Sequence, residues 1–558
     1  MNKLQLIAAL ASSLSLVATA SAQTFHLNDL EYFETRGANV LVYNNKYAGI
    51  FADEKKAGVE MILRGVRVAT GGGIRLTNAP EQWDVYPEVV SRDVDKSTST
   101  ISTVLRYADY DFTSVMKVRP QGNGVVVSVV LDKPVPAALE GKAGLTLEFF
   151  PASYFGTNFM MDGKPQILPH HPAGDSRMRP YSDRVSQFYG LSTFDDRGRG
   201  EYIDLHPIAE GHKLVMAPER DDLMVSISSD SDIKLFDGRN LAQNGMFVAR
   251  TILPAGKTGE VASWFIETVY DPRWVREPNV GFSQVGYLPS QPKIAVVELD
   301  KRDKMRSSAS VYKVNADGSS SKAFTGKVSM WGPYYKYNYA KFDFSDLREP
   351  GVYYIQYGDV KTNNFIIDTT VYDKITDATT DVWIPIHMNH MHVKEGYRVW
   401  HGEPFKEGYL QAPTNTDHFD LHGQGPTTDT KYKALELIPG LNVGGYFDAG
   451  DFDIETGANI GVVQNFVSIW ELFKPMRDMT FVSESQRYVD LHRPDGTPDI
   501  LQYIEHGTLN IVAQAEQIGH MSQCLSNSVL YNYHHLGDAA SLTDGYHYDP
   551  SLKPYQVS

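Results

Sequence analysis

The spacing of apolar residues changes once along this 558-residue chain, and that change limits the folds open to it. Up to about residue 370, apolar residues occur in short alternating or β-branched runs separated by turns that contain Gly and Pro. Such runs are typical of antiparallel β-structure. After residue 372 they recur at helical spacing, in 459–476 and again in 498–519. The sequence therefore predicts β-domains first and a helical region last.

The first 22 residues are interpreted as a signal peptide. Lys3 supplies the positive start, residues 4–20 are mainly apolar, and Ala20-Ser21-Ala22 is a small-x-small cleavage site. A membrane anchor is the weaker alternative, because the apolar stretch is short and interrupted by polar residues. We expect an exported protein, periplasmic or extracellular, with no membrane contact after cleavage.

Three domains follow the leader in this interpretation. Residues 23–279 are predicted to form an all-β sandwich whose role the residues do not reveal. Residues 280–370 have a strand about every ten residues, which favours a small immunoglobulin-like sandwich. Residues 371–558 form the helical region.

Composition excludes several functions. The net charge of −16, without any long Lys/Arg block, is repelled by phosphate backbones, so no nucleic-acid partner is expected. Cys524 is the only cysteine, which excludes an intramolecular disulfide. The chain also lacks a P-loop, a dinucleotide fingerprint and a Gly-x-Ser-x-Gly elbow.

The densest chemical motif is residues 443–453, just before the first predicted helix. Asp448, Asp451 and Asp453 lie there among three glycines that free the backbone. Such a loop can direct two carboxylates at one point, so that one holds a water molecule and the other accepts its proton. This arrangement predicts general-base catalysis.

The aromatic residues Tyr446 and Phe447 precede these carboxylates and offer flat faces on which a pyranose ring can lie. Other interpretations of the motif remain open. Gly- and Asp-rich loops bind calcium, although the spacing of the twelve-residue calcium loop is absent. Asp453 or Thr456 can also simply cap the following helix.

The motif resembles the Asp-Ala-Gly-Asp signature of glycoside hydrolase family 9, the inverting cellulases. Upstream segments are similar to the immunoglobulin-like domain that precedes many of its catalytic domains, and a downstream segment is similar to the next barrel helix. The upstream segments are Gln284-Val-Gly-Tyr-Leu-Pro289, residues 292–297, 342–346 and 350–353, and the downstream segment is residues 494–507.

The resemblance implies a partial (α/α)6 barrel after two β-sandwich domains, and inverting hydrolysis of β-1,4-glycosidic bonds in cellulose-like or related plant β-glucans. Asp451 would be the general base, and Asp448 would help to position the attacking water. The family's general acid is a Glu far downstream, on the opposite side of the sugar. Since this sequence ends at Ser558, we expect a chain truncated within the barrel and inactive by itself.

No cofactor is expected. Family members with this domain often hold a structural zinc through Cys and His, but the matching region here contains His387, His390 and His392 and no Cys. Because structural zinc sites need four converging ligands, we expect no metal there, and calcium stays open. The alternative function is a non-catalytic carbohydrate-binding or structural protein.

Overall fold

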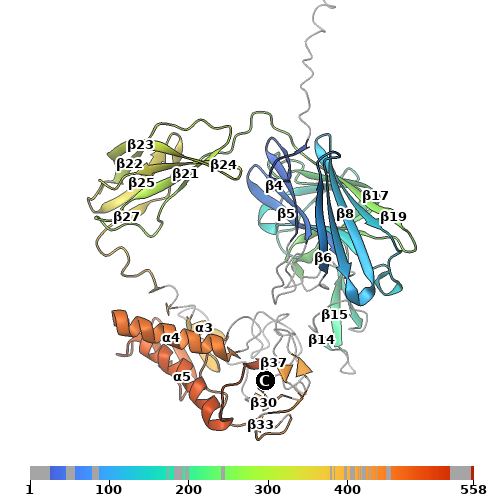
Figure 1. Cartoon of the computed structure of the whole chain (residues 1–558). Coiled ribbons are helices and arrows are strands. Elements are labelled where there is room, and N and C mark those ends of the chain that lie inside the picture. The colour runs from blue at the N-terminus through green and yellow to red at the C-terminus, as the bar shows by residue number, and fades with distance from the viewer. Residues whose placement is uncertain are drawn as a thin grey trace, which may run out of the picture.

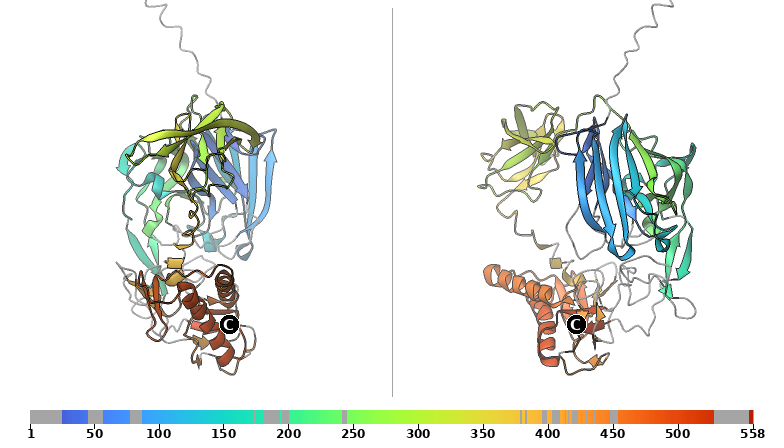
Figure 2. Two further views of the ribbon diagram at one scale, coloured as in Figure 1. Left: turned by 90° about the vertical axis from the view of Figure 1, so that its left-hand side faces the viewer. Right: turned by 45° about the vertical axis from the view of Figure 1, so that its right-hand side comes forward.

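The computed structural model describes most of the chain, in segments. These are residues 25–44, 57–77, 87–172, 175–180, 193–194, 200–240, 245–377, 380–381, 384–394, 399–402, 409–412, 414, 416–417, 423–424, 426–428, 430–434, 436–447, 454–527 and 555–557. The predicted signal peptide, residues 1–22, lies outside them. Figures 1 and 2 show a large β-structure, a smaller one and a region that holds the two long helices.

The first β-region is one continuous hydrogen-bonded sheet. Its main path runs β1-β2-β3-β4-β5-β10-β18-β17-β19-β9-β8-β7-β6, and β11, β12 and β16 branch from it. The strands are β1 (His26–Leu27), β2 (Phe33–Thr35), β3 (Ala38–Asn44), β4 (Ala57–Leu63), β5 (Val66–Arg75), β6 (Glu88–Asp95), β7 (Thr100–Tyr107), β8 (Phe112–Gln121), β9 (Gly124–Leu131), β10 (Gly144–Phe149), β11 (Asn158–Met161), β12 (Lys164–Ile167), β16 (Ala209–Met216), β17 (Val225–Asp237), β18 (Phe247–Ile252) and β19 (Gly259–Thr268). A separate small sheet contains β13 (Ser176–Pro180), β14 (Thr193–Phe194) and β15 (Gly200–Leu205).

This sheet folds over itself around one apolar core. Alternate residues of β3, Ala38, Val40 and Val42, are buried in that core, as the period of two in a half-buried strand requires. The two ends of the sheet meet where Arg92 on β6 donates from Nε to the carbonyl oxygen of Val42, at 2.8 Å. Burial of the two inner faces is therefore the main stabilising term of this domain.

The second β-region has an eight-stranded sheet in the order β20-β21-β24-β23-β22-β25-β26, with β27 paired to β25. Its strands are β20 (Asn279–Gly281), β21 (Ile294–Asp300), β22 (Ser308–Val314), β23 (Ser320–Tyr334), β24 (Tyr337–Asp343), β25 (Gly351–Tyr357), β26 (Val360–Lys361) and β27 (Phe365–Ile367). The long strand β23 pairs with β22 through its first half and with β24 through its second half, which joins the two layers.

The Gln284–Pro289 motif fixes the entry of the chain into this domain. Gly286 has φ +113°, and a Cβ there would lie 2.3 Å from the carbonyl oxygen of Ile366, so only glycine fits. The next residue, Tyr287, is buried and makes edge-to-face contacts with Phe344 and Phe365. The motif thus places an aromatic anchor in the core between the sheet layers.

The connector between the two β-regions contacts both of them. Arg36 donates from Nε to the carbonyl oxygen of Trp274, at 2.8 Å. Arg276 forms an ion pair with Glu298 at 2.6 Å, and its guanidinium lies 4.6 Å from the centre of the Tyr337 ring. These contacts order the connector against the first sheet on one side and the second on the other.

The described residues after 371 form one short helix and two long ones, together with small sheets. The helices are α3 (Ile384–Ile386), α4 (Thr456–Phe473) and α5 (Asp499–Gln517). Gly519, with φ +82°, follows the end of α5 and supports the left-handed termination predicted from the sequence. The strands are β28 (Met391–Lys394), β29 (Val399–Gly402), β30 (Tyr409–Gln411), β31 (Thr416–Asp417), β32 (Gly423–Gln424), β33 (Leu437–Ile438), β34 (Ile454–Glu455), β35 (Thr480–Ser483), β36 (Tyr488–Leu491), β37 (Cys524–Asn527) and β38 (Tyr555–Val557).

The predicted fold class, with a partial (α/α)6 barrel after two sandwiches, is wrong. The described part of the chain is dominated by strands, and no ring of paired helices forms within it. Helical apolar spacing occurs only where α4 and α5 form. The segments before them pair as strands instead, as where β28 lies parallel to β36. Within the described ranges, no helix has the length and apolarity needed to cross a bilayer.

Candidate active site

The backbone just before the predicted catalytic loop is fixed against α5. The amide nitrogen of Gly445 donates to the carbonyl oxygen of His506, at 3.0 Å. Gly444 has φ +64°, and a Cβ on it would lie 2.2 Å from that same oxygen. The motif therefore needs glycine here because no side chain fits between this turn and the helix.

Asn389 holds the other side of the same turn. Its amide nitrogen donates to the carbonyl oxygen of Gly445 at 2.9 Å, and its side-chain Nδ2 donates to that of Gly444 at 3.0 Å. One step further along the chain, the Phe447 amide donates to the carbonyl oxygen of His387, at 2.8 Å. The turn is thus clamped between α5 and residues 387–389.

A buried histidine on α5 links this turn to an acidic side chain. His506 is fully buried; its Nδ1 lies 2.7 Å from Glu484 Oε1 and its Nε2 lies 2.9 Å from the carbonyl oxygen of Gly445. Both ring nitrogens therefore face acceptors, and a neutral imidazole can donate to only one of them. The His506 ring therefore connects the Glu484 side chain to the turn at Gly445.

The two aromatic residues predicted to bind sugar are both packed inside the domain. Tyr446 donates from its hydroxyl to the carbonyl oxygen of Tyr503 at 2.6 Å and packs edge-to-face against Phe466 and His506. Burial raises the pKa of the Tyr446 hydroxyl well above its ordinary value. Phe447 is buried in a neighbouring apolar cluster. Neither ring presents an open face, so their placement favours a packing role.

The predicted catalytic residues Asp448 and Asp451 lie outside the described residues. The chain on their far side is fixed as well: Ile454 on β34 pairs with Leu525, and the Thr456 amide donates to the carbonyl oxygen of Gln523 at 3.0 Å. The described structure therefore fixes the residues on either side of the segment 448–453.

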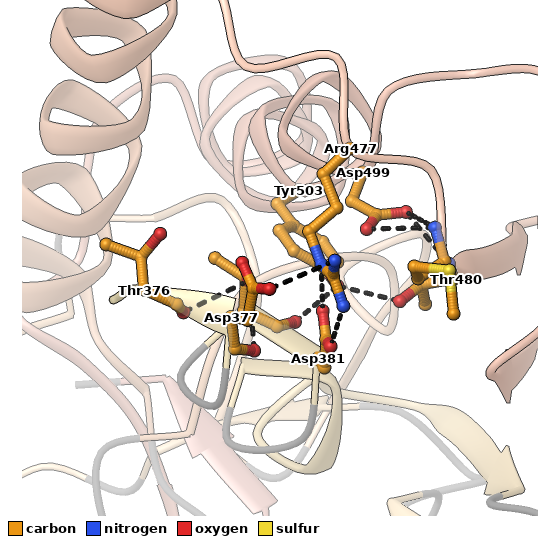
Figure 3. Close-up of polar contacts among 9 residues, drawn as sticks. Thr376, Asp377, Asp381, Arg477, Thr480, Asp499 and Tyr503 are labelled. Atoms are coloured by element: carbon orange, nitrogen blue, oxygen red, sulfur yellow. Dashed lines mark hydrogen bonds and ion pairs between the residues drawn. The ribbon is translucent and has the colours of Figure 1, made fainter. Parts of the chain in front are cut away.

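A second polar cluster joins the helical region to the segment that leaves the immunoglobulin-like domain (Figure 3). Arg477 Nη1 lies 3.1 Å from Asp377 Oδ2, and Arg477 Nε donates to Asp381 Oδ1 at 2.8 Å. Nearby, the Asp499 carboxylate accepts hydrogen bonds from the Thr480 and Met479 amides, at 2.8 and 2.9 Å. The cluster brings three acidic side chains together around one arginine.

The Asp499 carboxyl in this cluster has a raised pKa. Burial raises its pKa to about 6, and the negative charges of Asp381 and Asp478 add to the effect. The hydrogen bonds from the Met479 and Thr480 amides act in the opposite direction and do not outweigh burial. Asp499 fixes the strand at Thr480 to the start of α5 and makes no hydrogen bond or ion pair with residues 443–447, the described part of the motif, which indicates a structural role.

The sequence did not single out Asp499, Arg477 or His506 as functional residues. A helical plot of residues 499–514 could have placed Asp499 and His506 on the buried face. Within the described ranges, no three His, Cys, Asp or Glu side chains come close enough to hold a metal ion.

The comparisons with known proteins place one segment of this chain in a defined class. Residues 275–362 match the family described as "Cellulase N-terminal ig-like domain". The second β-region is therefore an immunoglobulin-like domain of the cellulase type, and the resemblance of the Gln284–Pro289 motif to that domain is confirmed.

Several solved structures of endoglucanases also align with the chain. A metagenome-derived glycoside hydrolase family 9 endoglucanase is 21% identical with a TM-score of 0.35, covering 45% of this chain and 43% of that one. A Bacteroides ovatus protein titled GH9 is 20% identical with a TM-score of 0.32, covering 44% and 41%. The matched part thus spans less than half of each relative's length. No curated protein of known function matches the sequence.

Proposed function

We propose that this protein is an exported glycoside hydrolase that cleaves β-1,4-glycosidic bonds in cellulose-like or related plant β-glucans with inversion. The observation that carries the proposal is the immunoglobulin-like domain at 275–362, a domain described for cellulases. It precedes the Gly-Gly-Tyr-Phe-Asp-Ala-Gly-Asp motif of residues 444–451, in the order in which the two occur in family 9.

In this proposal Asp451 is the general base that takes a proton from the attacking water, and Asp448 positions that water. The clamped turn at Gly444 and Gly445 supports the assignment, because a base must be held within hydrogen-bonding reach of its water. Inversion also needs a general acid, with its carboxyl roughly 6.5–9.5 Å from the base. None of the glutamates of this chain is proposed as that general acid.

The test is the release of reducing sugar from a soluble β-1,4-glucan. It compares this chain with a longer chain that continues along the reading frame past Ser558. Activity of the longer chain alone supports the proposal and the position of the acid. Absence of hydrolysis from both chains contradicts it.

One variant of the active form tests the role of Asp451, and a second variant is its control. Asp451→Ala is expected to lower kcat by roughly 100-fold or more and to leave the affinity for substrate nearly unchanged, since the base acts mainly in the transition state. The control is Asp359→Asn, which changes an exposed carboxylate in the immunoglobulin-like domain. Near-normal rates of hydrolysis for Asp451→Ala would contradict the assignment of Asp451 as the general base.

A non-catalytic carbohydrate-binding protein is the second candidate. Exposed aromatic side chains on β23, including Trp331 and Tyr334, favour it.

A further inference from the structure

The immunoglobulin-like domain exposes several aromatic rings at one end of β23 and β24. Trp331 is 57% exposed, Tyr334 56% and Tyr335 70%. Together with Tyr339 and Val296, these side chains form what we call the aromatic surface. Large apolar groups gathered in water on a folded domain mark an interaction site.

An irregularity of the backbone turns Trp331 outward. Met330 pairs with Ala340 and Gly332 pairs with Tyr339, so that Trp331 between them is the extra residue of a β-bulge. Bulges redirect a side chain and interrupt regular pairing, and they are frequent next to functional sites. The exposure of Trp331 is therefore built into the strand.

Tyr335 occupies a conformation that its side chain disfavours. It is the first residue of the two-residue turn between β23 and β24, and its φ is +48°. Glycine or asparagine is usual at this position because a bulky residue is strained there. Its ring packs only partly, edge-to-face against Tyr334 at 4.5 Å between centroids. Because Tyr335 is strained and its ring is exposed, we expect it to serve a function other than stabilising the domain.

The rings border a shallow hollow that is largely open to solvent. Trp331 and Tyr334 each stand at an angle to Tyr339, with ring centroids 6.3 Å apart in both pairs. The hollow has a volume of about 450 Å³, within the usual range for ligand pockets. Its lining residues are Val296, Trp331, Tyr334, Tyr339, Ala340 and Lys341.

Polar groups border the apolar faces. Tyr339 donates from its hydroxyl to Glu298 Oε2 at 2.7 Å, and Glu298 in turn pairs with Arg276. Lys341 lies across from Val296 on the neighbouring strand. A ligand seated in the hollow would thus meet mainly ring faces, with the Lys341 side chain beside them and the Tyr339–Glu298 pair nearby.

We propose that the aromatic surface binds a neutral oligosaccharide chain, at a site separate from the candidate active site. A pyranose presents C–H groups on its faces and hydroxyls around its edge, which match the rings and their polar border. The net charge of −16 disfavours polyanions. A stable protein partner needs about 800 Å² on each side, whereas this hollow is lined by six residues.

Calorimetric titration of the full chain with cellohexaose tests the proposal; the choice of a β-1,4-glucan rests on the proposed function. Trp331→Ala and Tyr334→Ala are each expected to weaken binding roughly tenfold. Trp331→Phe should retain most of the affinity. The control Phe155→Ala removes an exposed ring from the first β-domain and should leave binding unchanged. Wild-type affinity in Trp331→Ala and Tyr334→Ala overturns the proposal.

Tyr335→Asn separates binding from folding. Asparagine tolerates φ near +50° better than tyrosine does, so the variant is expected to unfold at the same temperature as the wild type or higher. Its affinity for cellohexaose should nevertheless fall several-fold. An unchanged affinity at this position would show that the strained ring does not touch the ligand, and would contradict its part in the site.

The outcomes also distinguish this inference from the proposed function. Binding that is lost in Trp331→Ala supports the inference even if no form of the protein hydrolyses glucan. Hydrolysis with unchanged binding in Trp331→Ala supports the function and overturns the inference. If the wild-type chain binds none of cellohexaose, xylohexaose and mannohexaose, the inference is overturned whatever the hydrolysis assay shows.

Discussion

His506 Nδ1 lies 2.7 Å from Glu484 Oε1, and this contact joins the middle of α5 to the residue that follows β35. Through its other nitrogen the same ring reaches the carbonyl oxygen of Gly445. One buried side chain therefore links two distant segments to the turn that carries the candidate catalytic loop. The first prediction concerns this ring.

His506→Ala removes the contacts of both ring nitrogens, so that Glu484 loses this partner and the Gly445 carbonyl keeps only the hydrogen bond from the Asn389 amide. Because the variant also leaves a cavity where a fully buried ring stood, we expect a loss of roughly 2–4 kcal/mol in the free energy of unfolding. Urea denaturation measures it. Glu505→Ala, at the preceding, exposed position of α5, is the control and should change stability little. Equal stability of the two variants would contradict the linking role.

Gly444→Ala tests the close approach of the turn to α5. The added methyl group would lie 2.2 Å from the His506 carbonyl oxygen at φ +64°, so the turn must move. We expect a loss of about 2 kcal/mol or more. In contrast, Gly457→Ala adds a methyl group in α4 that meets no atom within 4 Å, and it should stabilise by about 0.4–1 kcal/mol. Thermal unfolding of both variants checks the opposite signs.

Stability should depend on pH through Asp499. Because burial raises its pKa to about 6, the folded state holds the proton more tightly than the unfolded state does. Protonation of Asp499 therefore contributes stability below the unfolded pKa of about 3.9, and this contribution is lost as the pH rises through about 6. Relative to Asp499→Asn, the wild type should lose stability between pH 4 and 7.

Urea unfolding of both proteins at several pH values measures that difference. Asp317→Asn is the control, because hydrogen bonds from Ser319 lower the pKa of that exposed carboxyl. Its difference from the wild type should be constant across the same window. A difference for Asp499→Asn that is also constant would contradict the raised pKa.

Arg477→Leu should loosen the segment that leaves the immunoglobulin-like domain. Without the guanidinium, the carboxylates of Asp377 and Asp381 lose their partner and repel each other. We expect faster proteolytic cleavage near residue 377 and a loss of about 1–2 kcal/mol in stability. Arg493→Leu, which removes an exposed arginine paired with Asp490, is the matched control. Equal cleavage rates in both variants would show that Arg477 does not restrain the segment.

Local patterns in the sequence predicted the elements well. The short alternating or β-branched runs expected before residue 370 form strands such as β9 and β25, and the two helical periodicities correspond to α4 and α5. Buried residues such as Val463 and Phe466 recur at the helical period in α4, whereas Phe473 at the end of α4 and Val512 on α5 are exposed. The spacing of apolar residues was therefore sufficient to predict where these strands and helices form.

The contacts around the motif could not be predicted in the same way. Glu484 and His506 are far apart along the chain, and no local pattern pairs them, although the helical period of α5 places His506 on its buried face. The barrel was inferred from a resemblance alone, whereas pairings such as β28 with β36 depend on long-range contacts that no local pattern encodes. Tyr446 was predicted from its chemistry to face sugar, but the packing around α5 buries it.

The bulge at Trp331 has a further consequence for solubility. Beyond Val328, β23 is paired with β24 on one side, and the described residues provide no ladder partner on its other side. A flat apolar edge of this kind is a template for aggregation. The bulge, Gly332 at φ +143° and Pro333, which has no amide hydrogen, interrupt that edge. The domain can therefore keep its aromatic rings in water without recruiting a strand from another copy of the chain.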